Sequence, residues 1–398
     1  MSDTHKEASL SRPAGGPLAA FDHQPRTRII FGLDVGERVG ELAREIGMKR
    51  PLLVTDPGVV GAGHAERAHQ SLRRAKIEPV VFDKVRENPT TRDVQDCLHV
   101  ARTSPIDGII GLGGGSSMDT AKGCNFLLTN GGKMRDYWGV GKATQPMLPL
   151  IAIPTTAGTG SECQSFALIA DEITHQKMAC GDWKAAARVA ILDPALTMSQ
   201  PPRVAACTGI DALSHALETA VSTKRNPLSL AYSREAFRLC STSLPGVLQK
   251  GNDMEARAGM LVGAALAGLA IENSMLGAAH AAANPLTAHF RIVHGQAVGM
   301  MLPAVVRFNA EQPEAARLYQ TLQGGEIGRL FLRLEWLLNL AGMPRSLGDC
   351  QIEPTAISKL AAEAAKQWTA NFNPRPMTEA DFVRLYQAAF EPRGDGAP

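Results

Sequence analysis

The chain has 398 residues, of which 44% are hydrophobic and 20% charged, and its formal net charge at pH 7 is +2. A chain of this length exceeds one ordinary hydrophobic core and favours two domains. The near-neutral charge and the absence of a basic run argue against a nucleic-acid surface. The seven cysteines form no C-x-x-C pair, which is typical of a reducing compartment. We therefore expect a globular cytoplasmic protein that binds neither nucleic acid nor membrane.

Residues 1–22 are expected to form a mobile polar tail, because they lack the basic start and apolar core of a signal peptide. The longest apolar stretch, GMLVGAALAGLAI at 259–271, is rich in alanine and glycine and falls short of a membrane span. Neither segment predicts membrane insertion.

Residues 23–200 alternate short apolar runs with amphipathic stretches. Strand-like runs are TRIIFG, PLLVTD, EPVVFD, DGIIGLGGG and PLIAIPTT, and helical spacing occurs in ERVGELAREIG, HAERAHQSLRRAK and SSMDTAKGCNFLL. This repeated strand–helix–strand order predicts a parallel sheet with helices on both faces. From the Pro201–Pro202 pair to residue 398, strand signals vanish and the segments have helical spacing. The expected fold is an α/β domain at 23–200 followed by an all-helical domain at 201–398.

A glycine-rich segment, GLGGGSSMDTAK at 111–122, follows an expected strand and begins a helix. Glycines let the backbone approach an anion closely, and the free N–H groups at a helix start favour negative charge. A tight strand-to-helix turn would need glycine only for its dihedral angles, and three successive glycines exceed that need. The segment therefore predicts a phosphate-binding loop, although Ser116 replaces the last glycine of the standard dinucleotide fingerprint.

Two other strand ends carry polar groups. Asp56 ends PLLVTDPG, where a carboxylate can accept hydrogen bonds from a ribose 2′-OH and repel a 2′-phosphate. The same residue can equally begin a D-P-G turn. TTAGTGSE at 155–162 follows the strand PLIAIP, and its hydroxyls can face a nucleotide or cap the next segment.

A carboxylate and three histidines are candidate metal ligands. GIDALSHALE places Asp211 and His215 four residues apart, so a helix would bring both side chains to one face about 6 Å apart. Alone, such a pair can also be a surface hydrogen bond. His280 and His294 would lie roughly 21 Å apart on one straight helix, but Pro285 between them predicts a break or bend that returns His294 towards His280. The set suits Fe(II) or Zn(II) with an open coordination position.

Four ordered motifs resemble those of the iron-dependent (group III) alcohol dehydrogenase family. They are GGGSSMDTAK, PTTAGTGSE, GIDALSHALE and the H-x13-H segment that ends HGQAVGMMLP. The likeness extends from FGLDVGERVGEL to NPRPMTEADFVRLYQAAF, nearly the whole chain after the tail. It implies a Rossmann-like dinucleotide-binding domain, a helical metal-binding domain, an active site in the cleft between them, and a homodimer.

The resemblance also implies a role for each matching position. The implied metal ligands are Asp211, His215, His280 and His294. The implied cofactor-binding residues are Gly113, Gly114, Gly115 and Ser116 at the pyrophosphate, Thr155, Thr156 and Thr159 along the nucleotide, Asp119 on the helix after the glycine loop, and Asp56, which favours NAD over NADP.

The chain departs from the family at one position. Family members commonly read H-x-x-x-H-P where this chain reads H-A-A-A-N-P, so Asn284 replaces the second histidine. That histidine lies close to the substrate in the family and is not usually a metal ligand. We therefore expect the metal site to persist and Asn284 to lie near the substrate without titrating. His289 matches no functional position and is expected to have a structural or surface role.

The expected function is NAD(H)-dependent interconversion of a small alcohol and its aldehyde or ketone, with Fe²⁺ or Zn²⁺ polarising the substrate oxygen. Three alternatives use the same scaffold. A zinc polyol (glycerol-type) dehydrogenase fits the ligand set, a maleylacetate-type reductase without metal is disfavoured by it, and a non-catalytic nucleotide- or metal-binding relative is suggested only by Asn284.

Overall fold

The computed structural model describes residues 20–174 and 176–394, so residues 1–19 of the predicted tail lie outside the described residues. A six-stranded parallel sheet forms the N-terminal half, in the order β1-β9-β6-β4-β2-β3. Its strands are β1 Arg28–Phe31, β2 Pro51–Val54, β3 Val80–Phe82, β4 Gly108–Gly113, β6 Leu150–Pro154 and β9 Val189–Leu192.

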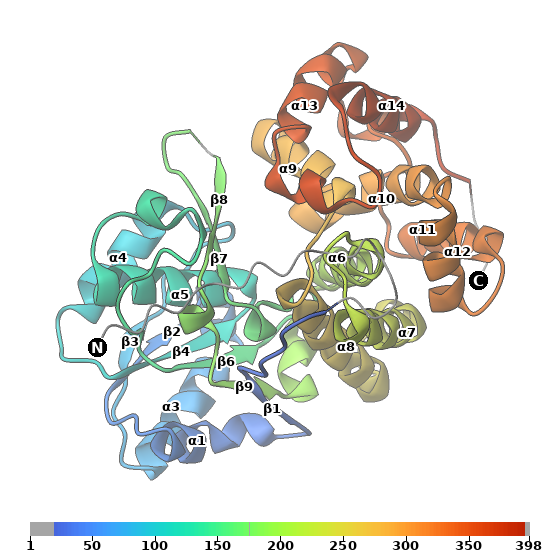
Figure 1. Ribbon diagram of the computed structural model, residues 1–398. Helices are drawn as coiled ribbons and strands as arrows, with labels where there is room; N and C mark the ends of the chain where they lie inside the picture. Colours follow the sequence, from blue (N-terminus) through green and yellow to red (C-terminus); the bar gives the residue numbers. More distant parts are fainter. Residues whose placement is uncertain (1–19, 175, 395–398) are drawn as a thin grey trace.

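Helices cover both faces of this sheet (Figure 1). They are α1 Val39–Glu45, α2 Pro57–Gly61, α3 His64–Arg74, α4 Thr91–Ala101 and α5 Gly115–Asn130. Successive strand residues point to opposite faces. Leu52 accordingly packs with residues of α4 and α5, whereas Leu53 packs with residues of α1 and α3. The alternation of strands and helices in the sequence predicted this layered arrangement, and the structure confirms it.

A smaller sheet stands beside the large one and holds β5 Gly139–Val140, β8 Lys177–Gly181 and β7 Phe166–Ala170, in that order. Strands β7 and β8 form an antiparallel hairpin, which projects from the α/β half in Figure 1. None of these three strands was predicted from the sequence.

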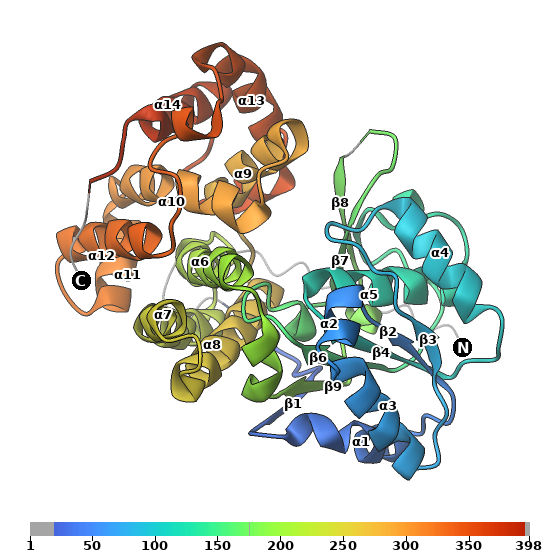
Figure 2. The same ribbon diagram turned by 180° about the vertical axis from the view of Figure 1, so that it is seen from behind.

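The C-terminal half is helical throughout its described residues, as predicted. Its α-helices are α6 Pro202–Val221, α7 Pro227–Gln249, α8 Met254–Glu272, α9 Ala278–Phe290, α10 His294–Ala310, α11 Pro313–Gln323, α12 Ile327–Leu340, α13 Ile357–Ala364 and α14 Glu379–Phe390. They share one hydrophobic core. Figure 2 shows this half from behind, with α6, α7 and α8 nearest the sheet. The domain boundary at residue 200 stays a prediction.

Helix α8 corrects one expectation from the sequence. Its 19 residues, with a mean hydropathy of 1.4 in the most apolar window, are long and apolar enough to span a bilayer. The apolar stretch at residues 259–271 is too short to span a bilayer, but the helix begins five residues earlier, at Met254. However, 61% of that window is buried inside the protein, where its small residues pack against α6 and α7.

The chain reversal between His280 and His294 also differs from the prediction. Pro285 does not end α9, which continues to Phe290. The helix stops where Arg291 adopts a left-handed conformation with φ 55°, a common way to end a helix. His294 is then the first residue of α10. The reversal therefore depends on three residues after the helix rather than on the proline.

The strand order creates a crevice between β2 and β4. The connection that leaves β2 leads outward to β3, whereas the connection that leaves β4 leads towards β6 on the other side. In open α/β sheets, ligands bind at the carboxyl ends of strands at such a point of reversal. The segments that follow β2, β4 and β6 are the polar segments singled out in the sequence.

Candidate active site

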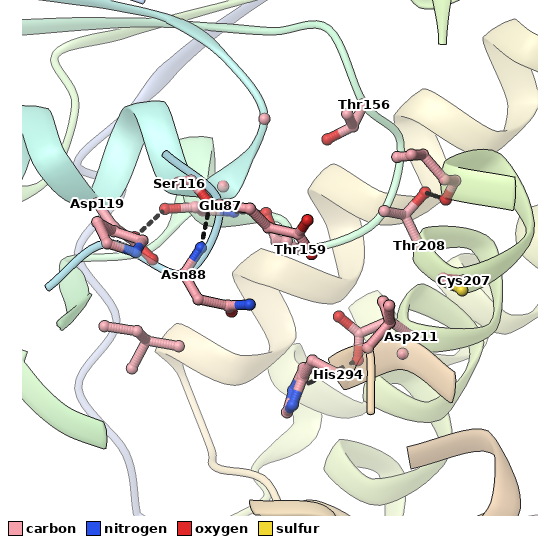
Figure 3. A pocket seen from close by; sticks show the side chains of 18 of the residues that line it. Glu87, Asn88, Ser116, Asp119, Thr156, Thr159, Cys207, Thr208, Asp211 and His294 are labelled. Atoms are coloured by element: carbon pink, nitrogen blue, oxygen red, sulfur yellow. Dashed lines mark hydrogen bonds and ion pairs between the residues drawn. The ribbon is translucent and has the colours of Figure 1, made fainter. Parts of the chain in front are cut away.

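A cavity of about 860 Å³ lies at this crevice and extends to the helices of the C-terminal half. Its size is that of a site for a small molecule or cofactor. Figure 3 shows Ser116 and Asp119 at one side of it, Thr159 between, Asp211 and His294 at the other side, and Thr156 above them. The predicted nucleotide segments and the predicted metal ligands therefore face one cavity.

The glycine loop packs directly against the threonine segment. The Thr155 N–H donates to the Gly113 carbonyl at 2.9 Å, which aligns the two segments. A Cβ added to Gly115 would lie 2.8 Å from Thr159 Cγ2, so only glycine allows this approach. Gly114 precedes α5 without a side-chain cap, which leaves N–H groups at a helix start beside the cavity. The loop thus has both a packing reason for glycine and the geometry of an anion site.

Asp56 is a turn residue that also lies at the cavity, and its contact with a nucleotide ribose stays a prediction. Its Oδ1 accepts the Val59 N–H at 3.0 Å and caps α2, as a turn residue would. Its Oδ2 accepts the Ser117 hydroxyl at 3.1 Å, and the side chain lines the cavity. The carboxylate of this turn residue therefore lies beside the glycine loop.

A buried ionic network supports the floor of the cavity. Asp119 Oδ1 accepts the Ser161 hydroxyl at 3.0 Å, and Lys122 Nζ donates to the Ser161 and Phe166 carbonyls at 2.6 and 3.0 Å. Burial raises the pKa of Asp119, while the nearby Lys122 ammonium opposes the shift. These bonds attach the segment after β6 to α5, so the two segments predicted to face a nucleotide are held as one unit.

The four predicted metal ligands converge. Asp211 and His215 extend from one face of α6, His280 from α9, and His294 from the start of α10. Asp211 Oδ1 lies 3.4 Å from His215 Nε2, 3.4 Å from His280 Nε2 and 3.9 Å from His294 Nε2. The Nε2 atoms of His215 and His280 are 3.1 Å apart. Three helices therefore bring one carboxylate and three imidazoles together.

These separations suit one cation. Four ligand atoms held about 2.1 Å from one ion at tetrahedral angles lie about 3.4 Å from each other. The separations among Asp211, His215 and His280, 3.1 to 3.4 Å, match that value, and these three ligand atoms form the compact cluster. His294 approaches it through Asp211 Oδ1, at the longer distance of 3.9 Å. Asp211 Oδ1 is buried and accepts no hydrogen bond within the described residues. Such an atom normally has a partner, and a metal ion bound here would supply one. The residues present fit the divalent metal that the resemblance implies.

The electrostatics of the cluster also favour a cation. Burial opposes ionisation of Asp211, but His215, His280 and His294 together lower its pKa well below the usual range. Burial lowers the pKa of His215 to about 4. Burial also lowers the pKa of His280, but the Glu218 and Asp211 carboxylates together outweigh burial and raise that pKa to about 9. Ionised Asp211 and neutral His215 are the protonation states that metal ligation requires, whereas His280, with its raised pKa, has to release the Nε2 proton when a metal binds.

Comparisons with known proteins agree with this geometry. Residues 25–194 match the family described as iron-containing alcohol dehydrogenase, and residues 205–390 match its C-terminal part. The chain belongs to this family. It is therefore an oxidoreductase that acts on CH–OH groups, and the resemblance inferred from the four motifs is confirmed.

Individual members of the family are similar over nearly their whole length. The chain is 32% identical to an NAD-dependent methanol dehydrogenase of Bacillus methanolicus, over 90% of this chain and 97% of that protein. It is 33% identical to a 1,3-propanediol dehydrogenase of Klebsiella pneumoniae, over 93% of this chain and 99% of that one. A solved alcohol dehydrogenase from Oenococcus oeni superposes with a TM-score of 0.89 at 31% identity, covering 93% and 100%.

Asn284, where the chain departs from the pattern of this iron-containing alcohol dehydrogenase family, has a hydrogen-bond partner within the described structure. Asn284 lies one helical turn beyond His280, and its Nδ2 donates to Gln367 Oε1 at 3.0 Å. The side chain is not among those that line the cavity in the described structure, so its proximity to substrate stays a prediction. His289 lies at the surface, where its Nε2 pairs with Glu363 at 2.7 Å.

The sequence analysis missed several residues at the site. Glu218 is buried and contacts His280. The sequence could have indicated it, because it follows Asp211 by seven positions and therefore lies on the same helix face. Lys177 on β8, Cys207 and Thr208 also line the cavity. Burial lowers the pKa of Lys177, while the charges of Asp119 and Asp211 oppose that shift. No local sequence pattern predicted the β7–β8 hairpin that carries Lys177.

Proposed function

We propose that the chain interconverts a small primary or secondary alcohol and its aldehyde or ketone, with NAD(H) and one divalent metal ion. The ion would be held by Asp211, His215, His280 and His294. The observation that carries the proposal is the convergence of Asp211, His215 and His280, within 3.1 to 3.4 Å, with His294 3.9 Å from Asp211, on the same cavity as the glycine loop. Iron is the metal in the family's name, and Zn²⁺ suits the same ligand types.

The nucleotide would lie across the crevice between β2 and β4. Its pyrophosphate would contact the backbone of residues 113–116 at the start of α5, and Thr155, Thr156 and Thr159 would line it from the opposite segment, with Asp119 beneath. Asp56 would face the adenosine ribose and favour NAD over NADP by charge.

When bound, the ion supplies Lewis-acid polarisation of the substrate oxygen, and the nicotinamide supplies or accepts the hydride. The chain orients these groups and limits water. His294 has 21% of its side chain exposed, against 5–6% for the other three ligands, so the cluster opens to the cavity beside it. Phe166 and Leu276 contribute apolar walls to that cavity. The Trp368 ring packs against the Phe166 ring, with the two ring centroids 5.8 Å apart. The proton of the substrate hydroxyl would leave through water, with Asn284 as a non-titrating neighbour.

The alternatives rank below this proposal. A reductase that works without metal leaves the buried, unpartnered Asp211 Oδ1 unexplained. A non-catalytic relative would have no need to keep both the glycine loop and the ligand cluster on one cavity. A polyol dehydrogenase would use the same ligands and differs only in substrate.

We further propose a cytoplasmic homodimer. All seven cysteines are free thiols, which suits a reducing compartment. Strand β1 lies at the edge of the large sheet with Ile29 and Phe31 exposed by 38% and 50%, and Leu33, just after the strand, is exposed by 60%. An apolar edge strand is a ready surface for pairing with a second copy.

The test is nicotinamide absorbance across a panel of primary alcohols, diols and aldehydes, with metal removed and then restored as Fe²⁺ or Zn²⁺. His280→Ala should abolish turnover and metal content by elemental analysis. His289→Ala, a matched histidine on the same helix that lies outside the cluster, should leave both near wild type. Full metal occupancy in His280→Ala would refute the ligand assignment.

A further inference from the structure

Helix α9 begins without a cap of its own. Its N-cap residue is Gly277, which has no side chain to accept the first N–H groups. Two residues from distant segments accept them instead. Glu218 Oε1 on α6 accepts the Ala279 N–H at 2.6 Å, and Asn373 Oδ1 accepts the Ala278 N–H at 3.4 Å. The start of α9 is therefore fixed by a carboxylate from the helix that also carries Asp211 and His215.

The second oxygen of the same carboxylate holds the His280 ring. Glu218 Oε2 lies 2.5 Å from His280 Nδ1. Because a carboxylate only accepts, Nδ1 is the nitrogen that carries the hydrogen. In the neutral ring this leaves the lone pair on Nε2, the atom that lies 3.4 Å from Asp211 Oδ1 and 3.1 Å from His215 Nε2. Glu218 thus specifies which nitrogen is available to a metal.

The surroundings of Glu218 are built around this double contact. Its side chain is 3% exposed, so neither hydrogen bond competes with bulk water. A Cβ at Gly277 would lie 3.1 Å from both Glu218 Oε1 and Asn373 Oδ1, so glycine permits both acceptors to reach the helix start. Asp211, His215 and Glu218 occupy positions i, i+4 and i+7 of α6, a single face of that helix.

We propose that Glu218 is the positioning residue of the metal centre: it orients the His280 ring, selects its Nδ1–H tautomer and fixes α9 against α6. This rests on the proposed assignment of His280 as a metal ligand. Carboxylates that accept the outer N–H of a ligating histidine typically change metal affinity by 10- to 100-fold. Here the Glu218 carboxylate also accepts a backbone N–H at the start of α9, so the position of the His280 ring is linked to the position of its helix.

Glu218→Gln tests the proposal with an isosteric change. Glutamine has one acceptor oxygen where the site needs two. Either Ala279 loses its acceptor, or the amide NH₂ faces Nδ1 and places the hydrogen on Nε2, where it blocks ligation. We expect Zn²⁺ affinity, measured by titrating the metal-free protein against a chromophoric chelator, to fall by about 10- to 100-fold. NADH affinity, measured by fluorescence, should stay within about twofold, because the glycine loop is untouched.

Three further variants make the outcome decisive. Glu363→Gln alters the surface pair with His289 and should leave Zn²⁺ affinity unchanged. Glu218→Asp keeps two acceptors on a shorter arm and should recover part of the affinity. His280→Ala sets the loss expected when the ligand itself is removed.

Wild-type Zn²⁺ affinity in Glu218→Gln, together with loss in His280→Ala, would overturn the positioning role and leave the metal centre standing. Wild-type affinity in His280→Ala would instead refute the metal assignment. Equal loss of Zn²⁺ and NADH affinity in Glu218→Gln, or failure of both Glu218 variants to fold, would also overturn the proposal, since Glu218 would then act through the fold as a whole.

Discussion

Asp56 has two tasks that a pair of substitutions can separate. Its Oδ1 caps α2 through Val59, and its Oδ2 receives the Ser117 hydroxyl beside the glycine loop. Asp56→Asn keeps a carbonyl oxygen for the cap and removes the charge. Asp56→Ala removes both. A change in cofactor preference that both variants share therefore measures the effect of the Asp56 charge. A change in stability seen only in Asp56→Ala measures the effect of the helix cap.

The charge effect follows from the position of Asp56 at the rim of the cavity. Two unit charges about 5 Å apart interact by roughly 1 to 3 kcal/mol for effective dielectric constants between about 80 and 20. Removing the carboxylate should therefore raise the NADP/NAD ratio of kcat/KM by about 5- to 100-fold, at about 1.4 kcal/mol per tenfold. The half-exposed position of Asp56 favours the lower end of that range. Loss of the cap in Asp56→Ala should cost about 1 kcal/mol of unfolding free energy.

The assay is initial-rate kinetics with NAD and with NADP at fixed alcohol and metal, repeated at high salt. The NADP/NAD ratio of kcat/KM should rise in both variants. High salt should reduce the difference between each variant and wild type, because it screens the repulsion between Asp56 and the 2′-phosphate. Thermal unfolding should distinguish the variants, with only Asp56→Ala less stable. A wild type that prefers NADP, or an Asp56→Asn ratio equal to that of wild type, would show that Asp56 is a turn residue alone.

Three other outcomes follow from the described contacts. Gly115→Ala should destabilise the protein by about 1 to 3 kcal/mol, because its Cβ would lie 2.8 Å from Thr159 Cγ2; adding Thr159→Ala should recover part of that loss in thermal unfolding, and no recovery would assign the cost elsewhere. Asn284→His should add an inflection to the pH profile of kcat between about pH 6 and 8 at unchanged metal content; identical profiles would show that residue 284, which bonds to Gln367, does not face the chemistry. Ile29→Lys on the edge strand should shift the mass measured by light scattering from dimer towards monomer, whereas an unchanged mass would place the interface elsewhere.

Much of the fold was readable from short-range patterns. Alternating strand and helix signals predicted the parallel sheet and its two helical layers. Neighbouring strand residues such as Leu52 and Leu53 are both apolar and are buried on opposite faces of the sheet. The i, i+4 spacing of Asp211 and His215 likewise predicted a shared helix face, and α6 has it. Periodicity is a property of neighbouring residues, so one sequence is enough to show it.

The completed site depended on contacts between distant segments. His280 and His294 meet because Arg291 ends α9 in a left-handed conformation, and the proline that the sequence analysis relied on lies within the helix. The partner of Asn284 is Gln367, 83 residues away, and Glu218 reaches His280 from another helix, 62 residues away. Such pairings follow from how helices pack in three dimensions, where each position depends on the shape of the whole core. The sequence alone thus determined which residue types could bind a nucleotide and a metal, and tertiary packing decided which atoms face each other.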